Sequence, residues 1–288
     1  MSAQPFIQVS DLHFSYLRGT PLEAAALRGA SMVVHRGEAV GIIGRAGSGK
    51  STLVQHFNGL LRPSGAGQVV VAGQDLSDPQ ADLRSIRQQV GLVFQVPEQQ
   101  LFERLVGDDI AFGPKKLGLE RPERRERVRW AMDMVGLDFE AFKDRFTVSL
   151  SGGEMRKVAL AGVLALRPEV LILDESTSGL DPRSRREMLA RFSALHRDQG
   201  LTLVFVSPSM EEIAGLVDRI YVMEQGRVAL HGPTRQVFAQ AERLRQCGLD
   251  VPQVTAIAHE LAALRLAADS VPLNVTEGVE VLWAALGN

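Results

Sequence analysis

The chain has 288 residues and a formal net charge of −2, with 45% apolar and 23% charged residues. This composition is ordinary for a folded globular protein, and a chain of this length buries a large core without disulfides. The near-balance of charge does not favour nucleic acid or an anionic membrane surface as a partner, and the single cysteine, Cys247, excludes an internal disulfide framework, as fits a reducing compartment.

The N-terminal ten residues show no basic segment followed by an apolar one, so we expect no signal peptide. No run approaches the roughly 18 to 20 consecutive apolar residues that a membrane span needs. The longest apolar runs, such as residues 158–166, are short and follow a helical pattern. We therefore expect a soluble chain that reaches a membrane only through another protein.

Apolar runs typical of β-strands recur along the chain, with helical patterns between most of them. They occupy residues 7–9, 39–43, 69–72, 90–94, 170–173, 201–206 and 220–223. Several are almost wholly apolar, which is typical of strands covered on both faces and predicts an α/β fold. Residues 12–16 and 31–34 alternate more and favour an antiparallel subsheet. Gly226 predicts a hairpin between residues 220–223 and 227–230.

The expected strand 39–43 leads into a glycine-rich loop that matches G-x-x-x-x-G-K-[ST] at every required position. We predict that the loop and the residue after it bind a nucleotide: Gly44, Arg45, Ala46, Gly47, Ser48, Gly49, Lys50, Ser51 and Thr52. Glycines let backbone N–H groups turn toward phosphate oxygens, Lys50 supplies a positive charge, and Ser51 offers a hydroxyl to Mg²⁺. An expected helix over residues 51–61 adds its positive end. A functionless glycine-rich turn is the alternative, and the strand–loop–helix context disfavours it.

Two sections differ from the α/β pattern. Residues 96–166 are rich in Arg, Glu, Ala and Leu, with helical spacing at Val128, Met132 and Val135, and predict an inserted helical subdomain. The chain turns helical again after Pro233, with breaks near Gly248 and Pro272. We expect residues 233–288 to form a helical C-terminal extension.

Two adjacent acids, Asp174 and Glu175, end the apolar strand 170–173. Carboxylates are costly to bury unless they have a function. Asp174 suits holding Mg²⁺ through water, and Glu175 suits orienting and deprotonating an attacking water. A strand end that simply reaches solvent is the alternative. The phosphate-binding loop upstream favours the functional interpretation.

The sequence Leu150-Ser151-Gly152-Gly153-Glu154 precedes an expected helix over residues 152–167. Here the chain resembles the nucleotide-binding subunits of ABC transporters, whose signature is most often L-S-G-G-Q. The resemblance implies that residues 151–154 reach across a head-to-tail dimer to the γ-phosphate held by the other subunit. Ser151 and Glu154 also have capping-box spacing, which any helix could use, but that does not explain the two glycines. Glu154 in place of glutamine implies a weaker contact.

Other positions match this family one by one. Gln95 resembles the glutamine that contacts Mg²⁺ and senses the membrane partner, and Asp181 belongs to a segment resembling the D-loop that crosses the dimer. Tyr16 resembles the aromatic residue that stacks on adenine, although an ordinary strand aromatic is the alternative. The resemblance covers the cassette, residues 1–232, and implies ATP and Mg²⁺ as cofactors.

Residues 94–102, 108–114 and 153–162, together with the helical tail, resemble the ATPases of energy-coupling factor importers. These systems import vitamins, cobalt or nickel. The resemblance implies a second ATPase subunit, a transmembrane coupling protein and a membrane substrate-binding subunit, with this chain peripheral on the cytoplasmic side of the cell membrane. A groove near residues 95–112 would receive the coupling protein. For Leu101, Phe102 and Phe112, docking and simple packing both remain open.

Two residues depart from the family pattern. Pro208 stands where the family has a histidine that contacts the γ-phosphate, and Ser176 stands where proline is usual and implies a looser backbone at Glu175. Because proline offers neither a side-chain donor nor an N–H, we expect a catalytically weakened site beside a stronger partner in an asymmetric heterodimer. A slow homodimer, and a regulatory subunit that binds ATP but hydrolyses it poorly, remain open.

A soluble ABC protein acting on ribosomes or chromosomes is the further alternative. Only 100 positions separate Lys50 from Leu150, which leaves no room for a long coiled coil. The chain also carries one phosphate-binding loop, whereas the ribosomal type has two cassettes, and its charge disfavours an RNA partner.

Overall fold

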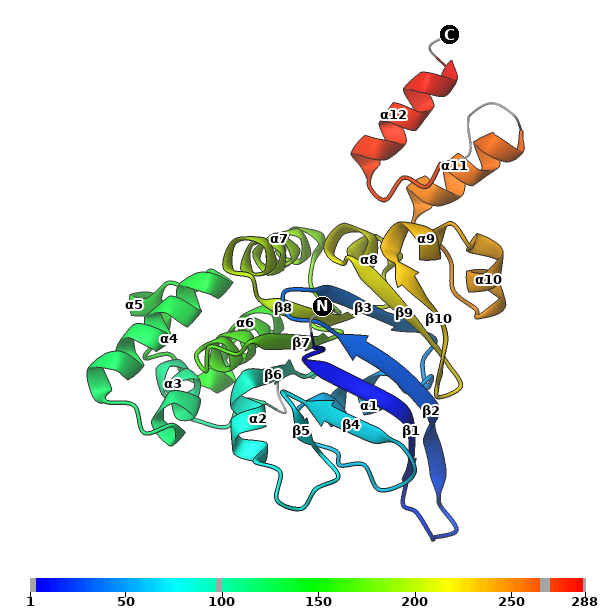
Figure 1. Ribbon diagram of the computed structural model, residues 1–288. Coiled ribbons are helices and arrows are strands. Elements are labelled where there is room, and N and C mark those ends of the chain that lie inside the picture. Colours follow the sequence, from blue (N-terminus) through cyan, green and yellow to red (C-terminus); the bar gives the residue numbers. More distant parts are fainter. Residues whose placement is uncertain (1–3, 97–99, 265–269, 287–288) are drawn as a thin grey trace.

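A six-stranded sheet forms the centre of the molecule (Figure 1). The computed structural model describes residues 4–96, 100–264 and 270–286. In order across the sheet the strands are β10 (Arg227–Pro233), β9 (Arg219–Glu224), β3 (Ala39–Gly44), β8 (Thr202–Val206), β7 (Val170–Asp174) and β6 (Val90–Val93). All neighbours are parallel except β10, which pairs antiparallel with β9 through the predicted hairpin at Gly226.

The predicted antiparallel subsheet is also present. Its order is β2 (Ala24–Val34), β1 (Ile7–Tyr16), β4 (Gln68–Val71) and β5 (Gln74–Asp75). Residues 7–9 and 12–16 form one strand rather than two. A bulge between them, with Asp11 at φ 47°, shifts the ladder between Val9 and Leu12. Strand β2 begins at Ala24, seven residues before the expected start, and β5 was not expected.

Side chains of the central sheet alternate between two apolar layers, as the two-residue period of a strand requires. Val40 and Ile42 face the layer shared with the antiparallel sheet, whereas Ala39 and Ile43 face the other. Helix α1 (Lys50–Phe57) buries Phe57 in the first layer. It ends four residues before the expected Leu61, where Asn58 and a left-handed Gly59 follow.

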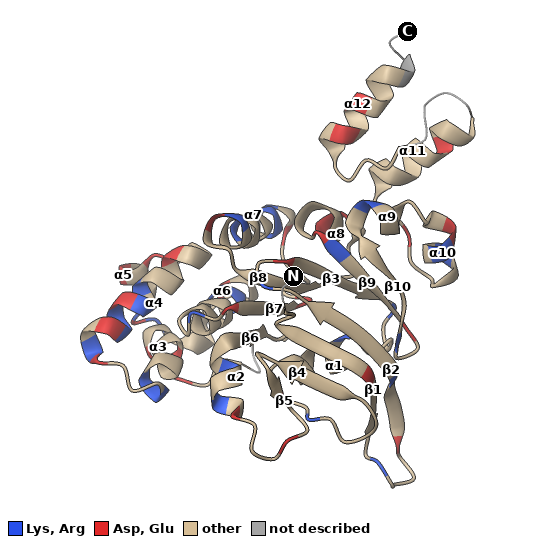
Figure 2. Cartoon of the chain, in the orientation of Figure 1, with Lys and Arg blue, Asp and Glu red and all other residues tan. Residues whose placement is uncertain are grey.

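Most other helices cover the second layer. They are α3 (Val106–Lys116), α4 (Arg121–Val135), α5 (Phe139–Phe142), α6 (Gly152–Leu164), α7 (Pro182–Gln199) and α8 (Met210–Leu216). Helix α2 (Leu83–Gln89) instead buries Ile86 in the first layer. Helices α3, α4 and α5 lie together at one end of the molecule, and α4 is densely charged (Figures 1 and 2). The predicted spacing at Val128, Met132 and Val135 is confirmed, since all three are buried. Helix α6 ends at Leu164 rather than Arg167, because Arg167 is left-handed (φ 54°) before Pro168.

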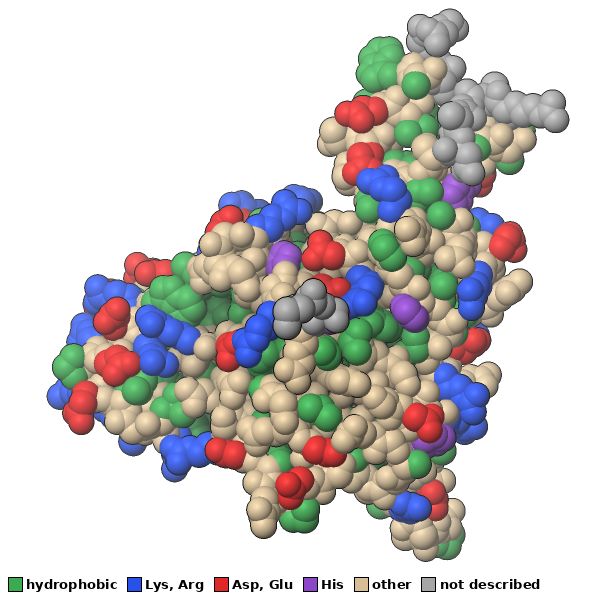
Figure 3. Space-filling view, in the orientation of Figure 1, with side chains coloured by type: hydrophobic (Ala, Val, Ile, Leu, Met, Phe, Trp, Pro, Cys, Tyr) green, Lys and Arg blue, Asp and Glu red, His purple; other side chains and the backbone are tan. Residues whose placement is uncertain are grey.

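The chain after β10 is helical, as expected. Helices α9 (Thr234–Phe238) and α10 (Ala241–Gln246) lie against the body, whereas α11 (Gln253–Ala263) and α12 (Val275–Leu286) form a lobe beyond it (Figures 1 and 3). Among the described residues of this lobe, five large apolar side chains are exposed: Ile257, Leu264, Val275, Val279 and Trp283. Within the described residues, no helix is both long enough and apolar enough to span a bilayer.

Candidate functional site

A pocket of about 530 Å³ lies where the glycine-rich loop meets the ends of the central strands. We call it the nucleotide pocket. Eight of the predicted site residues line it: Tyr16, Ala46, Gly47, Gly49, Lys50, Ser51, Thr52 and Gln95, with Glu175 as the predicted base beside them. Residues from four separate parts of the sequence therefore converge on one cavity, as the sequence predicted.

Two glycines of the loop are required for different steric reasons. A Cβ atom at Gly44 (φ 156°) would lie 2.4 Å from the carbonyl oxygen of Met223, so only glycine lets the loop leave the sheet there. Gly47 (φ 76°) instead faces open space, with nothing within 4 Å of the place of a Cβ. This leaves the backbone at Gly47 accessible to a ligand.

Lys50 is buried at the base of the pocket. Its ammonium group donates to the carbonyl oxygens of Gly44 (2.8 Å) and Arg45 (3.0 Å). Burial lowers the pKa of Lys50 from its ordinary value, while the nearby charges of Glu175 and Asp174 raise it. The ammonium group is thus held at the loop by two carbonyl acceptors that an anion can replace.

Asp174 has a carboxylate oxygen, Oδ1, that is buried and has no hydrogen-bond partner within the described part of the chain. Burial is the main cause that raises the pKa of Asp174; the Ser51 hydroxyl lowers it, the charge of Glu175 raises it and Lys50 lowers it. An unpartnered buried carboxylate oxygen beside a serine hydroxyl matches the oxygen ligands that Mg²⁺ prefers. The residues present therefore fit this cation.

Glu175 lies directly after β7 in the left-handed region (φ 49°). Its N–H donates to Val206 (2.9 Å) and its carbonyl accepts from Ser178 (3.0 Å), so its backbone is held on both sides although Ser176 replaces a proline. Gln95 donates from Nε2 to Glu175 Oε2 at 2.7 Å. Two predicted site residues that are 80 positions apart are thereby joined.

Tyr16 lies at the rim of the pocket, 40% exposed, with its ring edge-to-face against Phe14. Its hydroxyl lies 3.1 Å from Thr52 Oγ1. The pocket wall also includes residues 24–26, three alanines of β2 that the sequence analysis missed. Ala24 lies directly across from Tyr16 in the ladder, and Ala25 lies across from Ser15. The run of three small residues was the available signal.

A second pocket, of about 380 Å³, contains most of the signature segment. We call it the signature pocket. It is lined by Ser151, Gly153, Glu154, Lys157, Gly179, Leu180, Asp181, Ser184 and Met188. Gly152 is the first residue of α6. Within one chain, the predicted signature and D-loop residues thus lie together and apart from Lys50. The sequence did not predict Lys157 as part of this pocket.

The capping box at the start of α6 is confirmed. Glu154 Oε2 accepts from the N–H (2.8 Å) and hydroxyl (2.9 Å) of Ser151, and Oε1 lies 2.9 Å from Arg145 Nη1. The Ser151 N–H is the main cause that lowers the pKa of Glu154, with Arg145 contributing. The carboxylate that replaces the usual glutamine is therefore neutralised locally by Arg145. Asp181 caps α7, accepting from the N–H groups of Arg183 and Ser184.

A family model described as ABC transporter matches residues 27–178. The chain belongs to the ABC transporter family. Two relatives named energy-coupling factor transporter ATP-binding protein EcfA2 place it within that family: the one from Clostridium perfringens is 47% identical over 88% of this chain and 89% of its own length. The one from Symbiobacterium thermophilum is 49% identical over 94% and 92%. This chain is therefore an ABC-type ATPase of the energy-coupling factor group.

Solved structures agree with this assignment. CbiO1 from Clostridium perfringens, described as part of the ABC transporter complex CbiONQ, has a TM-score of 0.73 and 36% identity, covering 90% of this chain and 99% of its own. A dimeric ATP-binding cassette in a post-hydrolysis state, bound to ADP and Pi, also has a TM-score of 0.73, with 25% identity over 80% of this chain and 99% of its own. The expected ABC ATPase fold is confirmed.

The loop after β8 contains Pro208, where the sequence resemblance led us to expect a histidine. Pro208 is exposed there, between the buried Ser207 and the half-buried Ser209. Glu212, nearly buried, accepts from the hydroxyls of Ser207 (2.6 Å) and Thr177 (2.7 Å). The sequence analysis missed this carboxylate, which joins the loop after β8 to the loop after Glu175.

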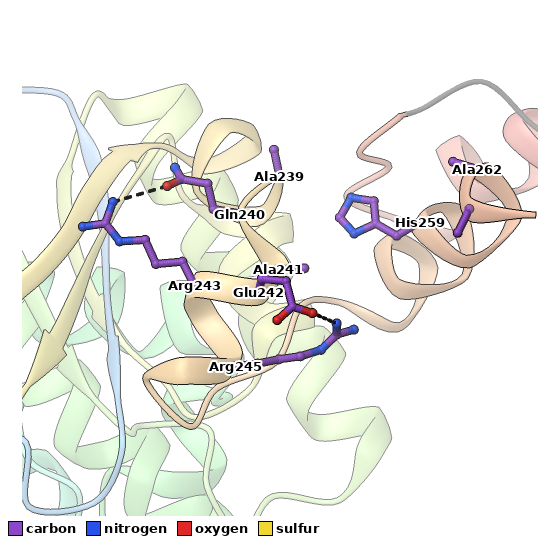
Figure 4. Close-up of a pocket in the computed structure, with 9 residues that line it drawn as sticks. Ala239, Gln240, Ala241, Glu242, Arg243, Arg245, His259 and Ala262 are labelled. Carbon is purple, nitrogen blue, oxygen red and sulfur yellow. Dashed lines mark hydrogen bonds and ion pairs between the residues drawn. The ribbon is translucent and has the colours of Figure 1, made fainter.

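A wider cavity of about 710 Å³ lies in the C-terminal extension, between α10 and α11 (Figure 4). His259 of α11 lies across from residues 239–242 in this view. Arg245 pairs with Glu242 (3.1 Å) and Arg243 bonds Gln240 (3.5 Å), so these polar groups satisfy one another. None of the residues that line the cavity belongs to the phosphate-binding loop.

Proposed function

We propose that this chain is the ATP-hydrolysing subunit that energises an energy-coupling factor importer of a vitamin or a transition-metal ion. The observation that carries the proposal is the convergence of Lys50, Gln95 and Glu175 on one pocket, with Asp174 directly beside them. A lysine cradle, a metal-binding carboxylate and a general base are the parts that nucleoside triphosphate hydrolysis requires.

We propose one orientation for the nucleotide in this pocket. The phosphates would lie on residues 44–51, where Lys50 exchanges a carbonyl acceptor for a phosphate oxygen and the N-terminus of α1 adds its positive end. The adenine would lie on Tyr16, whose ring is partly exposed at the rim. The small alanines of residues 24–26 leave room for it.

Mg²⁺, when bound, would neutralise phosphate charge and polarise the γ-phosphate. Ser51, Asp174 and Gln95 would hold it, and the unpartnered Oδ1 of Asp174 supports this assignment. Glu175 would accept the proton of the attacking water. The hydrogen bond from Gln95 orients its carboxylate for that task.

A second ATPase subunit would complete each site. On one chain the signature pocket is separate from the nucleotide pocket, so Ser151, Gly152, Gly153 and Glu154 would act on a nucleotide held by the partner, with Asp181 at the crossing. Serine and glycine N–H groups at the start of α6 suit a phosphate oxygen. This division supports a head-to-tail dimer.

A transmembrane coupling protein and a membrane substrate-binding subunit would hold the chain at the cytoplasmic face of the cell membrane. Phe102 supports a docking role because it is 64% exposed, with its ring edge-to-face against Phe112. Leu101, in contrast, packs against the core. Pro97, Glu98 and Gln99, also part of the expected groove, lie outside the described residues.

The test is to purify the tagged chain from solubilised membranes and identify what comes with it. We expect an integral coupling protein, a second ATPase and a third membrane protein, with ATPase activity that Glu175→Gln abolishes. Cells that lack the coupling protein should release the chain from the membrane fraction. Membrane association that persists without any integral partner would contradict the proposal.

One observation favours a more specific form, in which this subunit has the weaker site of an asymmetric heterodimer. Pro208 offers no donor to a γ-phosphate, whereas Lys50, Asp174, Glu175 and the signature remain in place. Such a subunit binds ATP and completes its partner's site but hydrolyses its own ATP slowly.

A further inference from the structure

Arg45, the second residue of the phosphate-binding loop, directs its side chain away from the nucleotide pocket. It is absent from the residues that line that pocket, and it lies across Gly248, at the end of α10 in the C-terminal extension. A Cβ atom on Gly248 would lie 2.6 Å from Arg45 Cδ and 3.1 Å from Arg45 Nε. The loop that holds phosphate thus contacts a segment more than 200 residues away.

Gly248 is held firmly in place. It is left-handed (φ 69°), its N–H donates to Arg245 (2.8 Å), and the N–H of Leu249 donates to Leu244 (2.9 Å). These two bonds form a Schellman cap, and Leu244 is fully buried. Gly248 is therefore a fixed surface against which the flexible arginine rests.

Arg45 in turn sets the position of Lys50. The carbonyl oxygen of Arg45 accepts from the Ser48 N–H (3.1 Å) and from Lys50 Nζ (3.0 Å). Arg45 therefore links Gly248, which its side chain contacts, to Lys50, which its backbone carbonyl holds. The path from Gly248 to Lys50 consists of one side-chain contact and one hydrogen bond.

We propose that Gly248 is a positioning residue for ATP binding: it holds Arg45, and through it Lys50, in the geometry that receives phosphate. This inference rests on the proposed function of the nucleotide pocket. Two properties of glycine suit this role: it adopts the left-handed conformation of the cap without strain, and it leaves room for the side chain of Arg45. The C-terminal extension thereby becomes part of the ATP site's support rather than an appendage.

The test is a double-mutant cycle on the full chain, read out as the affinity for a fluorescent ATP analogue with Mg²⁺. Gly248→Ala introduces a Cβ where Arg45 lies, so the contact is lost and we expect affinity to fall about three- to tenfold. Arg45→Ala should weaken binding by itself. The double variant should bind no more weakly than Arg45→Ala alone, because both changes remove the same contact.

The chain offers a matched control. Gly136 after α4 is also left-handed (φ 71°), forms the same pair of cap bonds, and is covered by an arginine, Arg191. Gly136→Ala should lower stability to a degree comparable with Gly248→Ala but leave ATP affinity unchanged. Gly248→Asn, which keeps the left-handed cap but still crowds Arg45, serves if the alanine variant folds poorly.

The outcomes separate this inference from the function on which it rests. Wild-type affinity in folded Gly248→Ala or Gly248→Asn, or effects that simply add in the double variant, would overturn the role of Gly248. Lys50→Ala in the same assay tests the pocket itself. If that variant binds ATP normally, the proposed function fails; if it binds weakly while the Gly248 variants do not, only the present inference fails.

Discussion

Lys50 is the residue on which we expect nucleotide binding to depend most. Its ammonium group is buried and held by only two loop carbonyls, so a phosphate gains a strong partner at little cost. Lys50→Ala should remove a charge-assisted contact of about 1.5 to 3 kcal/mol and weaken Mg-ATP binding about 10- to 100-fold. Titration with a fluorescent ATP analogue measures this, and an unchanged affinity would refute the assignment.

Pro208 should limit hydrolysis without limiting binding. The purified chain alone should show little ATPase activity, and Pro208→His should raise its turnover rate by about tenfold or more, because one transition-state contact contributes about 10² to 10³ in rate. Pro208→Ala is the control, since it changes the backbone without adding a donor. Brisk hydrolysis by the unmodified chain, abolished by Glu175→Gln, would show that Pro208 is no handicap and end the asymmetric interpretation.

Helix α3 is anchored by a buried acid in its first turn. Asp109 Oδ1 accepts from the N–H groups of both Phe102 and Glu103 (2.9 Å each), which fixes the segment that precedes the helix. Burial is the main cause that raises the pKa of Asp109, and these two N–H groups lower it by less. Folding therefore disfavours the ionised form of Asp109 relative to the unfolded chain.

A pH-dependent prediction follows for this element. Because the folded pKa of Asp109 lies above its unfolded value, its contribution to stability falls as pH rises from the ordinary pKa of an aspartate through the raised pKa of the folded state. Asp109→Asn keeps an oxygen for both N–H groups and removes the charge. The free energy of unfolding of the variant minus that of the wild type, measured with urea, should be larger at pH 7 than at pH 4. An opposite trend would contradict the burial argument.

The sequence predicted those elements that carry their own local signals. The parallel strands are apolar throughout, the phosphate-binding loop has a fixed pattern, and Ser151 and Glu154 mark the start of α6. Strand β2 was mostly missed because residues 24–26 are alanines with weak strand preference, and only pairing with β1 makes them a strand. Contacts between distant residues, such as Glu212 with Thr177 and Arg45 with Gly248, have no local signal and could not be predicted.

The lobe of α11 and α12 should be dispensable for the fold of the rest. Its ion pair with the body, Arg235 with Glu277, is partly exposed and contributes about 0 to 1 kcal/mol. Chain 1–252 should melt within about 5 °C of the full chain and keep its ATP affinity. Chain 1–240, which lacks Gly248, should bind ATP more weakly. Equal affinity of the two truncations would contradict a supporting role for the segment between them.

The separation of the nucleotide and signature pockets has a consequence for gene dosage. In the proposed head-to-tail dimer, each chain would contribute half of two different sites, so subunits in excess of their partner would be inactive. In that dimer, a copy without Lys50 but with Ser151 should still enter complexes and complete the opposite site. A copy without Ser151 should instead inactivate the site of its partner. We therefore expect signature variants that are co-expressed with the intact gene to reduce uptake by a larger fraction than the fraction of subunits that they make up.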